Sequence, residues 1–523
     1  MKCFFVPILL LLSLFSSAQL KTISQSPVFA EDESVGIQRV LLMKNGNTFY
    51  LSLTKKNLTV RVFSDKYKAK ATKQLHPELG KGSSFKVKGL FDINGEVVVL
   101  VSAVENHQVV LQRLIIDGVT GALKSVDKIG ELEKVSYFKL GGVAFANIPE
   151  PDFFSEALPE GNGYAVVAMN SFVSDRNKRI VVSIFDTDNK EISHAYYKSP
   201  EEKYKYMEYQ GMMALDKNKL SVLAYGYNTK SSGGKECQLL LATLTKGDTL
   251  LETESLGTSK KPSEVAVARY NPVSKKMMLL ELEDRTASVS IVDPFKKSVS
   301  GKIDIGSNGK SRSDMPQNLF TNEDGSFSIV YEKLSVSSNV PHIPGLSTDL
   351  GHTYGYYTSI EMEDYTVTVI AADGQEELQH YVIPRNHVRK NMMRSLAFNN
   401  AYTNFENAVD QPSPMESFNY LSAGGNNYLL LNDDADNIER IQAGKNPRKV
   451  KSLDDCDAFY YTLKGEKDTP PSDFLFGKPT EKRNYNKALF KACDYNADKK
   501  VYVVVKQQQN GNDGGWKLVW MKP

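Results

Sequence analysis

Side chains that could bind a charged or sugar-like ligand gather in three segments in the second half of the chain: residues 335–355, 384–414 and 433–457. A guanidinium group holds a carboxylate through two parallel hydrogen bonds, and an aromatic ring stacks on the apolar face of a ligand. The candidate ligand-binding residues in or beside these segments are His342, His352, Tyr356, Arg385, His387, Arg389, Arg394 and Arg440. Their types predict an anionic or glycan ligand.

An oxygen-rich run in the third segment makes Asp433, Asp434 and Asp436 candidate ligands for Ca²⁺, which prefers oxygen donors. The run lacks the glycine and the distal glutamate of an EF-hand loop. The histidines do not show the spacing of a helical zinc-binding pair, so no zinc site is predicted. No other cofactor is expected.

Local motifs of common enzymes are missing from the sequence. There is no G-x-S-x-G nucleophile elbow, no Walker loop and no dinucleotide-binding glycine pattern. The 64 Lys and Arg residues nearly balance the 62 Asp and Glu residues, for a formal net charge of +2, which argues against a nucleic-acid binder driven by bulk charge. The paired carboxylates of a glycoside hydrolase come from distant strands and leave no local motif, so that chemistry stays open.

The elements that must position these residues are strands in a repeated pattern. A turn of Gly, Asn, Asp or Lys residues precedes five or six strand-forming residues, as in Asn45-Gly46-Asn47 before TFYLSL. Such strands begin near positions 48, 97, 164, 220, 277, 327, 428 and 501. A second strand follows each of them, and a shorter third strand usually comes next. With the strand before each turn, the pattern predicts a four-stranded unit that occurs eight times.

A four-stranded sheet with two apolar faces cannot bury both faces alone, whereas a closed ring of stacked sheets buries all of them. The sequence therefore predicts an all-β protein, a β-propeller of eight four-stranded blades, with seven blades as the alternative. The last unit lacks its fourth strand, which the segment from Thr22 to Phe29 would supply by pairing with the C-terminal segment. From Thr22 to Pro523 the chain resembles secreted bacterial β-propeller proteins in architecture. The WD40 and kelch signatures are missing, so no family's catalytic residues carry over.

Loop lengths single out one face of this ring. In an up-and-down blade, the loops between the second and third strands and the connections between blades emerge on the same face. Segments 335–355 and 433–457 are such loops in blades six and seven, and segment 384–414 connects these two blades. Loops longer than about 15 residues are uncommon and often functional. We also expect a short helix from Asn386 to Phe398.

The N-terminus has the pattern of an export signal, with Lys2, an apolar stretch and small residues up to Ala18. We predict a signal peptide over residues 1–18 and a single propeller domain over residues 19–523. No cysteine follows the cleavage site, so the protein is expected in the periplasm or outside the cell without a lipid anchor. Of the mature cysteines, Cys237, Cys456 and Cys493, free thiols are the favoured interpretation, and a Cys456–Cys493 disulfide is the alternative.

Together these features predict an exported, non-enzymatic binding or scaffold protein of the bacterial cell envelope. It would engage a protein partner or an anionic or glycan ligand through the loops of blades six and seven. The alternative is a carbohydrate-active hydrolase or lyase with acidic residues near the propeller axis.

Overall fold

The fold is described from a computed structural model of the chain. The structure describes residues 19–30, 36–54, 57–79, 85–106, 108–134, 149–198, 203–228, 237–259, 265–283, 286–305, 314–338, 358–390, 418–465, 468–479, 484–510 and 513–523.

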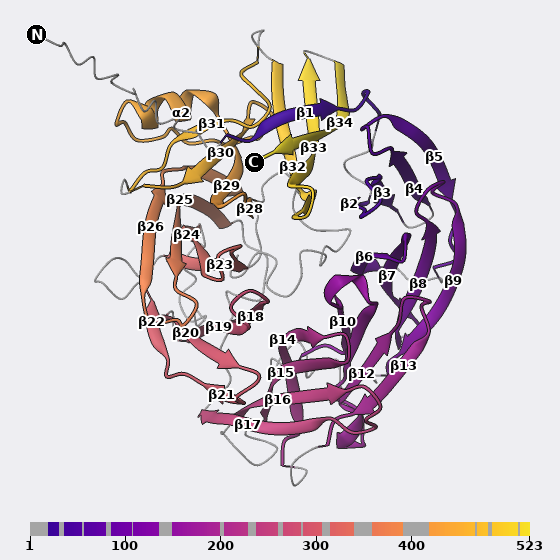
Figure 1. Cartoon of the computed structure of the whole chain (residues 1–523). Helices are drawn as coiled ribbons and strands as arrows, with labels where there is room; N and C mark the ends of the chain where they lie inside the picture. The colour runs from indigo at the N-terminus through magenta and orange to yellow at the C-terminus, as the bar shows by residue number, and fades with distance from the viewer. Residues whose placement is uncertain are drawn as a thin grey trace, which may run out of the picture.

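Eight antiparallel sheets follow one another around a ring (Figure 1). Blade one contains β2 (Ile37–Leu42), β3 (Thr48–Leu53), β4 (Leu58–Phe63) and β5 (Ala69–Leu75). Blade two contains β6 (Phe85–Ile93), β7 (Glu96–Glu105), β8 (Gln108–Asp117) and β9 (Leu123–Glu131). Blade three contains β10 (Asp152–Ala157), β11 (Tyr164–Met169), β12 (Ile180–Phe185) and β13 (Glu191–Tyr196). Blade four contains β14 (Tyr206–Asp216), β15 (Lys219–Tyr227), β16 (Cys237–Thr245) and β17 (Glu252–Ser259).

The second half of the ring repeats this order with additions. Blade five contains β18 (Val265–Asn271), β19 (Lys276–Glu283), β20 (Thr286–Asp293) and two short pieces, β21 (Ser298–Val299) and β22 (Ile303–Ile305). Blade six contains β23 (Asp314–Thr321), β24 (Phe327–Ser338), β25 (Thr358–Ile370), β26 (Glu377–Ile383) and β27 (His387–Lys390). Blade seven contains β28 (Asn419–Ala423), β29 (Asn426–Asp433), β30 (Asp457–Leu463) and β31 (Ser472–Phe474), with the helix α2 (Ala435–Gln442) between β29 and β30.

The ring closes through the two ends of the chain. Blade eight contains β32 (Asn484–Asn496), β33 (Val501–Asn510) and β34 (Asp513–Lys522), and its fourth strand is β1 (Lys21–Gln25). β1 pairs antiparallel with β34, and a further bridge joins Phe29 to Trp516. The predicted eight blades and the predicted closure by the N-terminal segment are confirmed.

Burial follows the position of a strand within its blade. Every residue of the central strand β3 is buried, whereas the outer strand β5 is mostly exposed. The buried apolar side chains of the described residues form eight clusters, one for each contact between neighbouring blades. Blades eight and one share the cluster that contains Tyr50, Trp516 and Trp520. Each sheet thus buries both apolar faces against its neighbours, as the stacking argument requires.

The expected helix from Asn386 to Phe398 is wrong in its first part, because His387–Lys390 form the strand β27. β25 is 13 residues long and extends beyond β26, so that its edge from Ser359 to Met362 pairs with β27 instead. Residues 391–417 lie outside the described residues. The helix in this region is α2, which the sequence analysis did not predict.

Cys237, Cys456 and Cys493 are free thiols, and the first two are buried. Among the described residues, no helix is both long enough and apolar enough to cross a lipid bilayer.

Candidate functional site

Two of the three long segments meet at the boundary between blades six and seven. The connection after β26 runs beside the insertion between β29 and β30, and their backbones pair. Val388 N donates to Val450 O at 2.9 Å, and Val450 N donates to Asn386 O at 2.8 Å. These bonds join residues about 60 positions apart in the sequence and fix the insertion against blade six.

Helix α2 begins the insertion and has the signals of a short helix. Asp434 is its N-cap, and the Asp434 carboxylate accepts a hydrogen bond from Asp436 N at 2.9 Å. Asp436 lies in the first turn and Arg440 in the last turn, which suits the helix dipole at both ends. Asn437 and Ile438 are buried and hold the helix on the blade.

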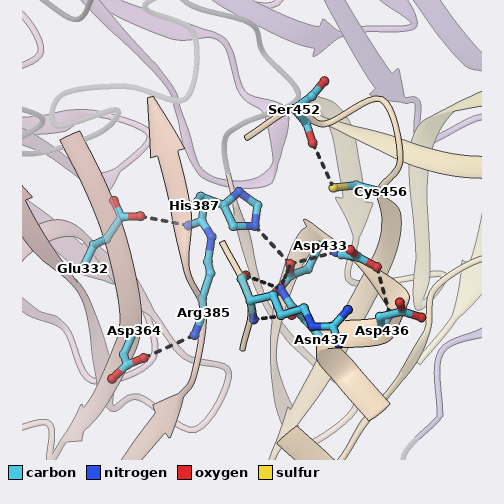
Figure 2. A network of polar contacts seen from close by, with 11 residues as sticks. Glu332, Asp364, Arg385, His387, Asp433, Asp436, Asn437, Ser452 and Cys456 are labelled. Atoms are coloured by element: carbon cyan, nitrogen blue, oxygen red, sulfur yellow. Dashed lines mark hydrogen bonds and ion pairs between the residues drawn. The ribbon is translucent and has the colours of Figure 1, made fainter. Parts of the chain in front are cut away.

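A buried ion pair lies beneath this surface. Nη1 of Arg385 donates to Oε1 of Glu332 at 2.8 Å, and the two side chains are only 3% and 5% exposed. The guanidinium also lies 4.7 Å from the centre of the Tyr365 ring. Backbone N of Arg385 donates to the Asp364 carboxylate at 3.2 Å (Figure 2). Burial lowers the pKa of Arg385, but Tyr365, Glu332 and nearby Asp433 outweigh it and raise that pKa overall.

A second buried pair connects the two blades directly. Nε2 of His387 lies 3.1 Å from Oδ1 of Asp433, and both side chains are almost fully buried (Figure 2). This contact is a hydrogen bond between the imidazole and the carboxyl group. The same Asp433 oxygen accepts from Asp434 N at 2.7 Å and from the Asn437 amide at 3.4 Å. Asp433 therefore joins the blade six connection to the start of α2.

Asn437 fixes the end of the insertion. The amide nitrogen of its side chain donates to Arg448 O at 2.9 Å, and its amide oxygen accepts from Arg448 N at 2.6 Å. Asn437 is fully buried, so these two bonds are shielded from water. They hold the stretch after α2 at one position relative to the helix.

Residues 440–451, here called the basic segment, contain five basic residues and no acidic residue: Arg440, Lys445, Arg448, Lys449 and Lys451. The side chains of Lys445, Arg448, Lys449 and Lys451 are exposed. Lys449 forms an ion pair with Glu361 of blade six, while Nε of Arg440 donates to Asn446 O at 2.9 Å. The segment thus presents positive charge on a surface that buried polar contacts hold in place.

The predicted ligand-binding residues have different positions. Arg385 and His387 are buried and contact protein groups, whereas Arg440 lies at the edge of the basic segment. Arg389 lies in β27 opposite Ile360, and its side chain is outside the description. His342, His352, Tyr356 and Arg394 lie outside the described residues.

The three aspartates proposed for Ca²⁺ have separate roles in the structure. Asp433 accepts from His387, Asp434 caps α2, and Asp436 is exposed in the first turn. Within the described ranges, no group of three or more His, Cys, Asp or Glu side chains is arranged to hold a metal ion.

Acidic side chains also lie on the innermost strands of the ring. Glu156 belongs to β10 and Glu208 to β14, on the neighbouring blades three and four. Burial raises the pKa of Glu156 to about 8, and Arg269 partly offsets this effect. Burial also raises the pKa of Glu208 to about 7. Acids near the axis are expected for the alternative function, but the sequence does not identify them, because positions on the inner strands come together only once the ring closes.

Comparison with known proteins finds only distant likenesses, all of them among solved structures. No protein-family model matches the chain, and no curated protein shows detectable similarity to it. Among solved structures, the Dos1 propeller is similar at 11% identity and a TM-score of 0.44, over 96% of this chain and 95% of that chain. Prolyl oligopeptidase B from Galerina marginata is similar at 8% identity and a TM-score of 0.40, over 91% of this chain and 56% of that chain. The WD40 domain of SCAP from fission yeast is similar at 9% identity and a TM-score of 0.36, over 75% and 79% of the two chains.

The fold-level resemblance to β-propellers that the sequence predicted is seen in the eight antiparallel sheets of the ring, not in these distant likenesses. Similarity at this level carries no argument about ligand, partner or reaction. The function must therefore be argued from the site itself.

Proposed function

We propose that this protein is an exported, non-enzymatic binding or scaffold protein of the bacterial cell envelope, and that the basic segment binds an acidic glycan. The β-propeller fold is consistent with a binding or scaffold role. Export is inferred from the N-terminal sequence, where residues 1–18 have the pattern of a cleaved signal peptide.

One observation carries this proposal: the backbone of the exposed basic segment is held in position by buried polar contacts. Buried ion pairs add little net stability, because removing two charges from water offsets most of their attraction. Arg385–Glu332 nevertheless fixes the connection to β24 of blade six, and His387–Asp433 fixes this connection to the end of β29, where the insertion begins. A surface ordered before binding loses less conformational entropy when its partner arrives.

The charge on this surface selects the class of ligand. Arg and Lys side chains form charge-assisted hydrogen bonds with carboxylates and sulfates, which acidic glycans carry along their length. Lys445, Arg448 and Lys451 are exposed and close in sequence. A polymer with regularly spaced anionic groups can contact all three at once, which a single small anion cannot do.

The test is the affinity of the protein for polygalacturonate, measured by calorimetry, with neutral dextran as the uncharged comparison. A triple variant, Lys445→Glu, Arg448→Glu and Lys451→Glu, should lose at least tenfold in affinity. Wild-type binding should also weaken as salt is added, because exposed charges are screened.

The matched control reverses three exposed lysines of blade one, Lys66, Lys68 and Lys70, to glutamate. This control variant has the same change in net charge as the first variant but keeps the basic segment intact. Its affinity for polygalacturonate should therefore change much less than that of the first variant. Equal losses in both variants would mean that only the overall charge matters. Retention of full affinity by the first variant would disprove the proposal.

A second candidate function rests on Glu156 and Glu208. A carboxyl group with a raised pKa stays protonated near neutral pH and can act as a general acid. Their places on the inner strands β10 and β14 are where a hydrolase or lyase acting near the propeller axis would need its acids. Release of reducing ends or unsaturated sugars from polygalacturonate, and its loss in the Glu156→Gln and Glu208→Gln variants, would support this function over pure binding.

A further inference from the structure

A cavity of about 130 Å³ lies inside the ring, away from the basic segment. Its walls come from the first strands of five blades, β2, β6, β23, β28 and β32, and from the residues beside them. Figure 1 shows these strands facing the central axis. The cavity therefore exists only in the closed ring, because its residues come from both ends of the sequence.

The polar part of the wall has a positive balance. Arg39 and Lys491 contribute two cations, Asp494 contributes one carboxylate, and Asn318 and Asn419 contribute amides. Burial lowers the pKa of Arg39 to about 10, so this guanidinium still carries its charge at neutral pH. The cavity thus contains one more positive than negative group.

Arg39 and Asp494 are held firmly in position. Nη1 of Arg39 donates to Gln38 O at 2.7 Å and more weakly to Lys491 O at 3.4 Å. Asp494 accepts from Leu42 N at 2.6 Å through one oxygen and from Tyr495 N at 2.8 Å through the other. The polar groups are therefore oriented before any ligand enters.

Another part of the wall is aromatic. Phe320, Phe418 and Phe490 line it. Phe320 stacks on Tyr420, with 4.8 Å between ring centres, and meets Phe418 edge to face. These rings give an apolar surface beside the charged groups, a combination typical of sites for small organic molecules.

Cys493 also lines the cavity but does not indicate covalent chemistry. Its thiol donates to Phe490 O at 3.1 Å, and burial raises its pKa to about 12. A thiol that stays protonated at neutral pH is a poor nucleophile. The arrangement therefore suits binding.

We propose that this cavity binds a small organic carboxylate, with its carboxylate group against Arg39 and its apolar part against the phenylalanine rings. A volume of about 130 Å³ is slightly below the roughly 150 Å³ of an apolar cavity that accepts benzene. Ligands of about six non-hydrogen atoms, the number in benzene, match this size. The inference does not depend on the proposed function of the basic segment.

The experiment measures binding of lactate and butyrate to the mature protein by calorimetry, with lactamide and butyramide as neutral counterparts. At least one carboxylate should bind, and its amide should bind at least tenfold more weakly, because charged hydrogen bonds to arginine are stronger than neutral ones. Arg39→Gln should weaken carboxylate binding at least tenfold.

The matched control is Arg113→Gln. Arg113 is also mostly buried and donates to Tyr164 Oη at 3.0 Å and to Asn189 O, but it does not line the cavity. Its loss should leave carboxylate affinity unchanged. Lys491→Met provides a second test that keeps Arg39 and should weaken binding at least threefold, whether or not Arg39→Gln folds.

Absence of carboxylate binding by the folded wild type at millimolar concentration would overturn the inference. Equal affinity for a carboxylate and its amide, or unchanged affinity in the Lys491→Met variant and in a folded Arg39→Gln variant, would do the same. The variant with a reversed basic segment should bind the carboxylate normally, so a failure of either proposal can be recognised separately.

Discussion

The buried pair Arg385–Glu332 gives the sharpest prediction about how the surface of blades six and seven is held. At an effective dielectric constant of about 20, two unit charges at the 2.8 Å observed here attract each other by about 6 kcal/mol before desolvation. Loss of one partner leaves the other charge buried, which typically costs about 3–5 kcal/mol. We therefore expect Arg385→Met and Glu332→Leu each to destabilise the protein by about that amount.

The double variant should recover most of the loss, because two apolar side chains replace the whole pair. The two losses should then differ from additivity by about 2 kcal/mol or more. Urea unfolding is the suitable assay, since urea does not screen charges as a guanidinium salt does. Hydrogen exchange of the Val388 amide, which donates to Val450 O, reports on the local effect if the large ring does not unfold in one step. Single losses below about 1 kcal/mol, or strictly additive losses, would refute this reasoning.

Three further predictions test the remaining parts of the structure. Asn437→Ala removes two hydrogen bonds to the Arg448 backbone and should lower the free energy of unfolding by about 1–3 kcal/mol. Trypsin should then cleave the basic segment faster, and an unchanged rate of cleavage would contradict this role of Asn437. Trp520→Ala should lower the stability measured by thermal unfolding by about 3–5 kcal/mol, because this fully buried ring packs between blades eight and one and donates to Thr48. A loss of stability below about 1 kcal/mol would contradict the role of this contact in closing the ring. Burial raises the pKa of Glu156 to about 8, so the folded protein keeps a proton on this carboxyl group that the unfolded chain releases near pH 4.5. The free energy of unfolding should therefore fall as the pH rises from about 4.5 through 8. Glu156→Gln should remove this dependence on pH and raise stability by about 1–4 kcal/mol at pH 9 but little at pH 4. An equal gain in stability at both pH values would contradict the proposed cause.

Much of the fold could be predicted because its signals are local. A turn followed by β-branched and aromatic residues marks the start of a strand without reference to the rest of the chain. The strands expected near positions 48, 164, 327 and 501 begin at Thr48, Tyr164, Phe327 and Val501. The closure by Thr22–Phe29 followed from counting strands, since one blade lacked its fourth.

The candidate site was harder to predict because its contacts are distant in sequence. Arg385 and His387 attracted attention as residue types that bind ligands, but their partners are 53 and 46 positions away. Loops have no periodic pattern from which burial can be read. The sequence therefore indicated the region and left open which side chains face the solvent.

The helix predicted from Asn386 fails for a related reason. The strand β27 forms there because the long hairpin of β24 and β25 offers a free edge, and the length of that hairpin is not visible at residues 386–398. Helix α2 did have a local signal, since Asp434 precedes an amphipathic run that ends in Arg440 and Ile441. That signal was assigned to possible calcium ligands instead, because aspartate serves both purposes.

The inner strands show an order that the sequence does not reveal. In blades two, four, six and eight the pairing of the first strand shifts at a β-bulge, whereas in blades one, three, five and seven it is regular. The extra residues in three of these bulges are Lys88, Gln210 and Gln317, each about 1% exposed.

A bulge places one additional residue on the inner strand and redirects the side chains around it. In a strand of period two, a single extra residue moves all following side chains to the other face. Around the ring, bulged inner strands therefore alternate with regular ones. The cavity around Arg39 borders bulged strands from blades two, six and eight, so these shifts help to set its shape.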